Sequence, residues 1–253
     1  MKSPDRSGGP QSGPVDSTQT AQIVNEFRQR LRKAGRPQVL KEYRRLYGNE
    51  IEAFGVKAAE VYKIGQDAVR RVRPGGLPLA ITVAEALVKS RNLEEGLLGT
   101  QLVGSMARLI TGSEFEHFER WANYLTNSQT AEGLGINCVA HAIAAKPSIA
   151  MRIQGWAQSE NPWIRCAAVA SLVPLVREGR FTTDALDIAA IVMTETQPEV
   201  QRTVGNMLMD ASRLRQERVI EFLESWKGRA SKRVLQLAAN KLPSEVRASI
   251  LRG

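Results

Sequence analysis

The sequence predicts an all-α protein, an α-solenoid of HEAT-like helix pairs, and three observations lead to this prediction. From Thr20 onward, apolar residues recur with the spacing of one helix face, and no segment shows the alternation of a strand. The helical segments are short, about 10 to 17 residues each, and brief Gly, Pro, Ser or Asn breaks separate them. Their recurring length, rather than any repeated sequence, indicates stacked helix pairs with a concave face.

The first expected helix, Thr20–Lys33, places Ile23, Phe27 and Leu31 on one face and basic residues on the other. Residues 1–19 before it are rich in Ser, Gly and Pro and have no apolar periodicity, so we expect a disordered tail there. Residues 20–253 are expected to form a single solenoid domain.

Later helices follow the same apolar spacing, and several have recognisable start signals. Ser113, Asn161 and Ser231 suit N-cap positions, and Pro147 and Pro162 suit a first helical turn. The later helices are expected at about residues 38–47, 57–73, 77–90, 93–110, 114–125, 132–145, 147–158, 163–177, 183–194, 197–211, 216–226, 230–241 and 243–251.

The charge balance favours a polyanionic partner. The chain has 35 Lys and Arg against 26 Asp and Glu, a net charge of +9, and 43% of its residues are hydrophobic. Such an excess fits nucleic acid first and an anionic membrane second. No apolar run approaches the about 18 residues of a membrane span, and no signal peptide is recognisable. We therefore expect a cytoplasmic monomer whose basic concave face fits a DNA duplex, with no membrane partner.

Motifs for cofactor or metal chemistry are absent from the sequence. It has no Walker loop, dinucleotide fingerprint, nucleophile elbow or zinc-protease motif, and Cys138 and Cys166 have no metal spacing around them. The Gly-rich fragment Gly133–Cys138 lies between helices, so close helix packing explains it better than a phosphate loop. We expect neither a cofactor nor a metal.

Basic clusters recur along the chain, at Arg28–Lys33, Lys41–Arg45, Val69–Arg73 and Lys227–Arg233. A single cluster is usually a solvated helix face. The last one differs, because Ser231 is followed by Lys232 and Arg233 at a helix start. A helix start suits a phosphate contact, which also makes Trp163 a candidate.

Four stretches in register resemble the AlkD-like DNA alkylation repair family, whose members are HEAT-like solenoids. They are FGVKAAEV (Phe54–Val61), KPSIAMRIQGWAQSENPWIRCAAVASL (Lys146–Leu172), PEVQRTVGNMLMDASR (Pro198–Arg213) and ESWKGRASKRVLQLAANKL (Glu224–Leu242). The resemblance runs from about residue 22 to 245. It implies a glycosylase that removes cationic alkylated purines while it holds the duplex.

Such enzymes use an aspartate, two tryptophans beside the lesion and an arginine on the backbone. Here the resemblance places Glu132 at the aspartate position, so Glu132 is the candidate catalytic residue. Ser128 and Asn206 stand at the tryptophan positions, and Cys166 stands at the arginine position. Arg165, one residue earlier, points about 100° away on a helix and cannot simply replace that arginine. A register shifted near residues 125–132 would instead use Trp121 and Leu125, which also loses the carboxylate.

We therefore expect a DNA-binding family protein, non-catalytic or weakly active, that recognises duplex, damaged or branched DNA. Two alternatives are an active glycosylase with an altered site for alkylated purines, and a protein-interaction scaffold, which has no general need for such a positive charge. The expected DNA-binding residues are Lys57, Trp163, Arg165, Lys227, Lys232 and Arg233.

Overall fold

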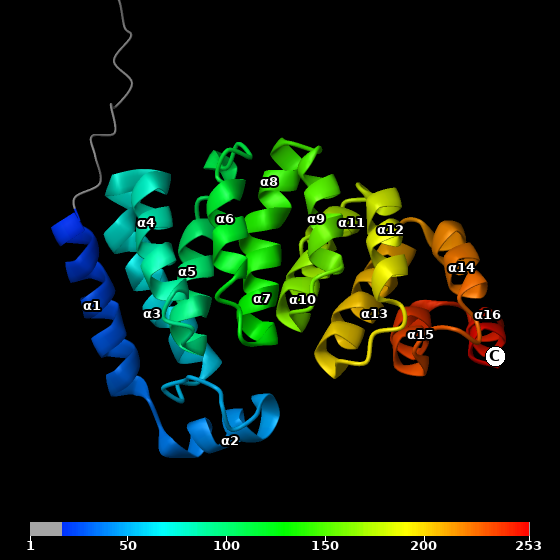
Figure 1. Ribbon diagram of the computed structural model, residues 1–253, viewed down its shortest axis with the longest axis horizontal. Coiled ribbons are helices and arrows are strands. Elements are labelled where there is room, and N and C mark those ends of the chain that lie inside the picture. Colours follow the sequence, from blue (N-terminus) through cyan, green and yellow to red (C-terminus); the bar gives the residue numbers. More distant parts are fainter. Residues whose placement is uncertain (1–16, 253) are drawn as a thin grey trace, which may run out of the picture.

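The computed structural model describes residues 17–252, which form helices and turns without a strand. The helices follow one another side by side along the long axis of the molecule, in chain order (Figure 1). The predicted all-α solenoid is confirmed. Residues 1–16 of the expected tail, 1–19, lie outside the described residues. Residues 17–19 belong to the first helix, which begins at Ser17.

The expected and observed helix boundaries agree closely along most of the chain. In order, the elements are α1 (Ser17–Ala34), α2 (Pro37–Tyr47), α3 (Ala58–Val72), η1 (Arg73–Gly75), α4 (Gly76–Val88), α5 (Leu93–Gly104), η2 (Ala107–Leu109), α6 (Phe115–Ala122), α7 (Ser128–Leu134), η3 (Gly135–Val139), α8 (Ala140–Ala145), α9 (Ile149–Ala157), α10 (Pro162–Ala170), α11 (Val173–Arg177), α12 (Thr182–Val192), α13 (Pro198–Ser212), α14 (Gln216–Ser225), α15 (Lys232–Ala238), η4 (Ala239–Lys241) and α16 (Ser244–Leu251).

Helix α7 begins earlier than expected because Asn127 caps it. The Asn127 side-chain oxygen accepts the backbone N–H of Thr130 at 2.9 Å, so the helix includes Ser128. Of the three predicted N-caps, Asn161 caps α10 through its side chain, whereas α6 is preceded by Glu114 and the Ser231 side chain makes no capping bond.

A one-turn π-helix, η3, joins α7 to α8 at the Gly-rich fragment that the sequence analysis singled out. A Cβ atom at Gly133 would lie 2.7 Å from the Thr100 hydroxyl, and one at Gly135 would lie 2.6 Å from the Ala167 carbonyl oxygen. Both distances are shorter than real Cβ contacts allow, so these glycines permit close packing against α5 and α10. The packing interpretation is confirmed.

The helices form two layers around a continuous apolar core. The inner layer consists of α3, α5, α7 with η3, α10, α13 and α15, each packed directly on the next. Successive helices of the other layer, such as α4 and α6, pack more loosely. Closer packing along one side curves a stack toward that side, which makes the inner layer the concave one. Trp121, Phe118 and Leu134 are among the side chains buried between the layers.

The turns that precede the inner helices lie along one edge of the solenoid, here called the helix-start edge. The inner helices all run in the same direction, so the turns that precede them lie next to one another. Hydrogen bonds join each of these turns to the next. These bonds are Leu93 N–H to the Glu52 carbonyl, Thr126 hydroxyl to the Arg91 carbonyl, Asn161 amide to the Leu125 carbonyl, Arg165 to the Glu195 carboxylate, and Ser231 N–H to the Met193 carbonyl.

Helix α2 lies apart from the stacked helices, beside this edge (Figure 1). The Glu94 carboxylate holds the segment that leads from α2 to α3, since it accepts the backbone N–H groups of Phe54, Gly55 and Val56 at 2.8–2.9 Å. Glu94 is fully buried. Its neighbour Glu95 is also buried and receives two hydrogen bonds from Arg28 of α1. Two adjacent carboxylates of α5 thus fasten both α1 and the loop after α2.

Candidate functional site

Glu132, the candidate catalytic residue, lies in α7 on the inner layer and is bonded to α13. Its Oε1 atom accepts a hydrogen bond from the Arg202 guanidinium at 2.6 Å and another from the Thr203 hydroxyl at 2.8 Å. Within residues 17–252, no bond is made to its other oxygen, Oε2. The side chain is 21% exposed. Glu132 is therefore an oriented carboxylate, paired with a cation and open to solvent on one side.

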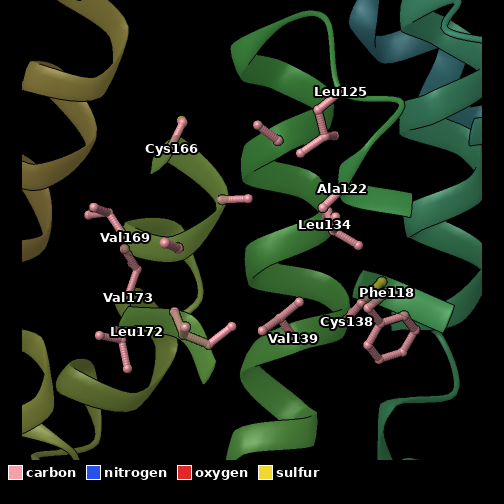
Figure 2. Close-up of a cluster of buried hydrophobic side chains, with 14 of the residues drawn as sticks. Phe118, Ala122, Leu125, Leu134, Cys138, Val139, Cys166, Val169, Leu172 and Val173 are labelled. Carbon is pink, nitrogen blue, oxygen red and sulfur yellow. The ribbon is translucent and has the colours of Figure 1, made fainter. Parts of the chain in front are cut away.

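Cys166 completes this cluster on the side of α10. Its sulfur lies 3.4 Å from the Thr203 hydroxyl, and the residue is fully buried. Figure 2 draws it with Val169, Leu134 and Cys138 as members of one cluster of buried hydrophobic side chains. Burial raises the pKa of the Cys166 thiol to about 12, with a smaller opposing effect of the hydrogen bond to Thr203. The position where the family resemblance implies a backbone-binding arginine thus holds a neutral core side chain.

The two positions where the resemblance implies tryptophans differ from each other. Ser128 is fully buried in the first turn of α7, and its hydroxyl has no partner in the described structure. Asn206 is partly exposed on α13, one turn beyond Arg202. In the alternative register, Trp121 and Leu125 are both core residues. Neither register places an indole ring beside Glu132.

An aromatic side chain of another element lies near enough to the charges of this cluster for them to affect its pKa, and the sequence did not predict this. Tyr47, the last residue of α2, is partly exposed, and its pKa is raised. Burial is the main cause, and Arg202 lowers the pKa while Glu132 and Glu199 raise it. The phenol therefore lies within the electrostatic reach of three charged groups from α7 and α13. Its sequence signal is an aromatic residue two positions after the basic cluster Lys41–Arg45.

The predicted DNA-binding cations differ in exposure: three are exposed, whereas Lys227 and Arg165 are partly buried. Lys57, at the N-cap position of α3, and Lys232 and Arg233, in the first turn of α15, are exposed and form no ion pair within the described residues. All three lie on the helix-start edge. Lys227 is partly buried in the turn before α15.

Arg165 already has protein partners. It donates to the Glu195 carboxylate at 2.6 Å and to the carbonyl oxygens of Ser159 and Glu160 at 2.8 and 3.0 Å. Burial of Glu195 acts against its charge, but the bonds from Arg165 and from two backbone N–H groups keep the pKa of Glu195 below its ordinary value. The neighbouring Trp163 is partly buried against the core, and Asn161 accepts its backbone N–H. Both residues support the local fold, and their DNA contacts stay predictions.

No group of three or more His, Cys, Asp or Glu side chains within residues 17–252 is arranged to hold a metal ion. In the same part of the chain, no helix combines the length and apolar character needed to cross a membrane.

The described residues form a HEAT-like helical solenoid whose inner layer carries the Glu132 cluster. Comparison with known proteins agrees with this fold. Residues 27–242 match the family described as DNA alkylation repair enzyme. The chain belongs to this family. Among curated proteins, no match was found.

A similar solved structure is Pseudomonas fluorescens alkylpurine DNA glycosylase AlkC bound to DNA containing an abasic site analog, with a TM-score of 0.51 and 13% sequence identity. The similarity covers 93% of this chain but only 66% of that one. The likeness concerns the fold.

Proposed function

We propose that this protein binds duplex DNA in alkylation repair through its inner layer and helix-start edge, and that it does not excise simple methylpurines efficiently. The family and the DNA-bound neighbour support a DNA partner. The exposed cations Lys57, Lys232 and Arg233, which form no ion pair among the described residues, lie at the starts of two inner helices, α3 and α15. Helix starts favour phosphate oxygens because of their free N–H groups and partial positive charge.

The observation that carries the catalytic part of the proposal is the ion pair of Glu132. Glycosidic cleavage of an alkylated purine builds positive charge on the sugar, which a carboxylate stabilises. At an effective dielectric constant of about 20, a charge about 4 Å from Glu132 would gain about 4 kcal/mol. The Arg202 nitrogen lies 2.6 Å from the carboxylate oxygen, so a guanidinium about 6.5 Å from the sugar would remove about 2.5 kcal/mol. The remainder, about 1.5 kcal/mol, corresponds to roughly tenfold in rate.

The absence of the family's tryptophans and arginine also favours slow base excision. Ser128 and Cys166 are buried, so neither presents a surface to DNA, and Asn206 offers an amide in place of a ring. Tyr47 supplies one aromatic ring from α2. A site with one nearby ring, and with a carboxylate whose charge is largely offset by Arg202, fits recognition of a distorted duplex better than rapid base release.

The test combines excision and binding on the same duplexes. Purified protein is incubated with DNA that contains 7-methylguanine or 3-methyladenine, and released base is measured beside a binding titration. We expect salt-sensitive binding and no release above the uncatalysed rate. Each neutralised phosphate should add about 0.9 to the slope of log K against log salt. Robust release that Glu132→Gln abolishes would refute the non-catalytic proposal, and binding that is independent of salt would refute the DNA surface.

An active glycosylase with an altered site is the second candidate. It is favoured by the Oε2 atom of Glu132, which has no hydrogen-bond partner among the described residues, on a side chain that is 21% exposed; this oxygen could position a water molecule. The amide of Asn206, where an indole is missing, leaves more room for a bulky adduct. Release of a bulky alkylated purine, but not of a methylpurine, would identify this function.

The protein-interaction scaffold is less favoured, because the exposed cations at the starts of α3 and α15 suit phosphates. A single domain, a monomeric state, a cytoplasmic location and independence of cofactors and metals stay predictions.

A further inference from the structure

A groove crosses the inner layer on the other side of α7 from Glu132. It lies over α5, between α3 and η3, and its volume is about 600 Å³. A second hollow of about 370 Å³ continues it, and the two share Arg73, Gly104 and Ser105. We call the two together the inner groove. From Ala58 to Arg73 its α3 wall is about 22 Å long at the usual helical rise of about 1.5 Å per residue.

Glycine opens the floor of this groove. A Cβ atom at Gly104 would lie 2.8 Å from the Asn137 side chain, which is closer than real contacts allow. Any larger residue there would push Asn137 aside or fill the hollow. The groove is thus a feature of the packing between α5 and η3, and the side chains along its rim remain accessible from solvent.

The chemistry of the lining matches an unpaired nucleotide. Tyr62 is 59% exposed and has no aromatic partner among the described residues. Three carboxamides, those of Gln66, Gln101 and Asn137, line the same hollow. An exposed aromatic ring stacks on any base, and carboxamides pair with the edges of bases that are not already paired.

The charge of the lining selects a polyanion. Arg70, Arg73 and Arg108 line the two hollows, and no Asp or Glu does. Arg70 is paired with Asp67, whereas Arg73 and Arg108 form no ion pair within residues 17–252. The two free guanidiniums lie at the end of the groove away from Tyr62. This arrangement places base-binding groups along the wall and phosphate-binding groups at one end.

We propose that the inner groove binds a short unpaired DNA segment, such as nucleotides displaced from a distorted or branched duplex. This rests on the proposed DNA-binding function and extends it, because the surface at Lys57, Lys232 and Arg233 contacts duplex phosphates, whereas the groove recognises free bases. Aromatic stacking has no role on a fully paired duplex, whose bases are already stacked. The groove therefore distinguishes unpaired from paired DNA.

The experiment measures the affinity of the full chain for three labelled DNAs: a paired duplex, a duplex with an internal unpaired loop, and a single strand. The variant Tyr62→Ala with Arg73→Ala is compared with Lys63→Ala, which removes an exposed cation of α3 outside the groove. We expect the double variant to bind the looped and single-stranded DNA at least about fivefold more weakly, the factor expected for one lost base stack. Its affinity for the paired duplex should change less than twofold, and Lys63→Ala should not discriminate among the three.

Other outcomes overturn the proposal, and they are separable from failure of duplex binding. Equal weakening on all three DNAs would make the groove part of the general duplex surface. Unchanged affinities, or wild-type protein that binds the duplex but no unpaired DNA, would remove unpaired DNA as the ligand. If the double variant lost affinity for an added acidic peptide but kept its affinity for all three DNAs, the groove would be assigned to a protein partner. Loss of duplex binding on Lys232→Glu with Arg233→Glu tests the proposed function independently. Because Tyr62 and Arg73 are exposed, melting temperatures should be unchanged and confirm intact folding.

Discussion

Replacing Glu94 by Gln tests whether one buried carboxylate fastens the α2–α3 segment. The two carboxylate oxygens accept three backbone N–H groups: Oε1 binds Gly55 and Val56, and Oε2 binds Phe54. In the Gln variant the remaining oxygen can still accept two N–H groups, but the new NH₂ group faces the third donor. One charge-assisted hydrogen bond is lost and one backbone donor is left unpaired.

The expected loss of unfolding free energy is about 2–4 kcal/mol. A hydrogen bond to a charged group contributes about 1.5–3 kcal/mol, and the cost of the unpaired donor, about 1–3 kcal/mol, overlaps with that loss and does not simply add to it. For a chain of this size, that corresponds to a fall in melting temperature of about 5–15 °C. Thermal and urea unfolding measure the loss. Hydrogen exchange should show faster exchange at the amides of Phe54, Gly55 and Val56. DNA affinity should fall as well, because the same segment positions Tyr47 of α2.

The matched control is Glu60→Gln, which changes an exposed carboxylate of α3 without hydrogen-bond or ion-pair partners among the described residues. Its effect should stay within about 0.5 kcal/mol. If Glu94→Gln melts within about 1 °C of the wild type and its three amides exchange no faster, the segment is held by other contacts and the reasoning is wrong.

Three further predictions concern the DNA surface and the core. Lys232→Glu with Arg233→Glu should weaken duplex binding in a titration and reduce the salt slope by about 2, with unfolding free energy changed by less than about 0.5 kcal/mol; unchanged affinity would place the surface elsewhere. Ser128→Trp should destabilise the protein by about 1–3 kcal/mol in urea unfolding, because the position is fully enclosed; a stable variant with an exposed indole would contradict this. Cys166 and Cys138 should resist thiol reagents at neutral pH until the protein unfolds, because burial raises both thiol pKa values; rapid native labelling would disprove it.

Much of the fold was predictable because its signals are local. The spacing of Ile23, Phe27 and Leu31 predicted α1, and all three are buried. Asn161 predicted the start of α10 through a cap that involves its own helix alone. The break of one expected helix into α10 and α11 was missed, although Pro174, in the first turn of α11, is a local signal of it.

The candidate site was predictable only in part. The family resemblance indicates Glu132. Its hydrogen-bond donors Arg202 and Thr203, however, lie 70 and 71 residues further along the chain, so the sequence could not predict them. The sequence predicts Arg165 as a DNA-binding residue, and the structure shows that its guanidinium donates a hydrogen bond to Glu195. A cation on a helix face has the same sequence signature whether its partner is a phosphate or a carboxylate of the next repeat.

The sequence by itself determined the helical class, the order of the helices and the positive charge, because periodicity, caps and composition act within a few residues. Tertiary structure decided which carboxylates are buried and hydrogen-bonded within the fold and which remain partly exposed to solvent. Glu94 and Glu95 stand in the first turn of α5, where acidic side chains are ordinarily exposed, yet both are buried because the turn after α2 and the α1 arginine close over them. The position of Tyr47 relative to the charges around Glu132 is also decided by tertiary structure. The angle at which one repeat stacks on the next sets these distances, and that angle depends on the packing of many side chains together.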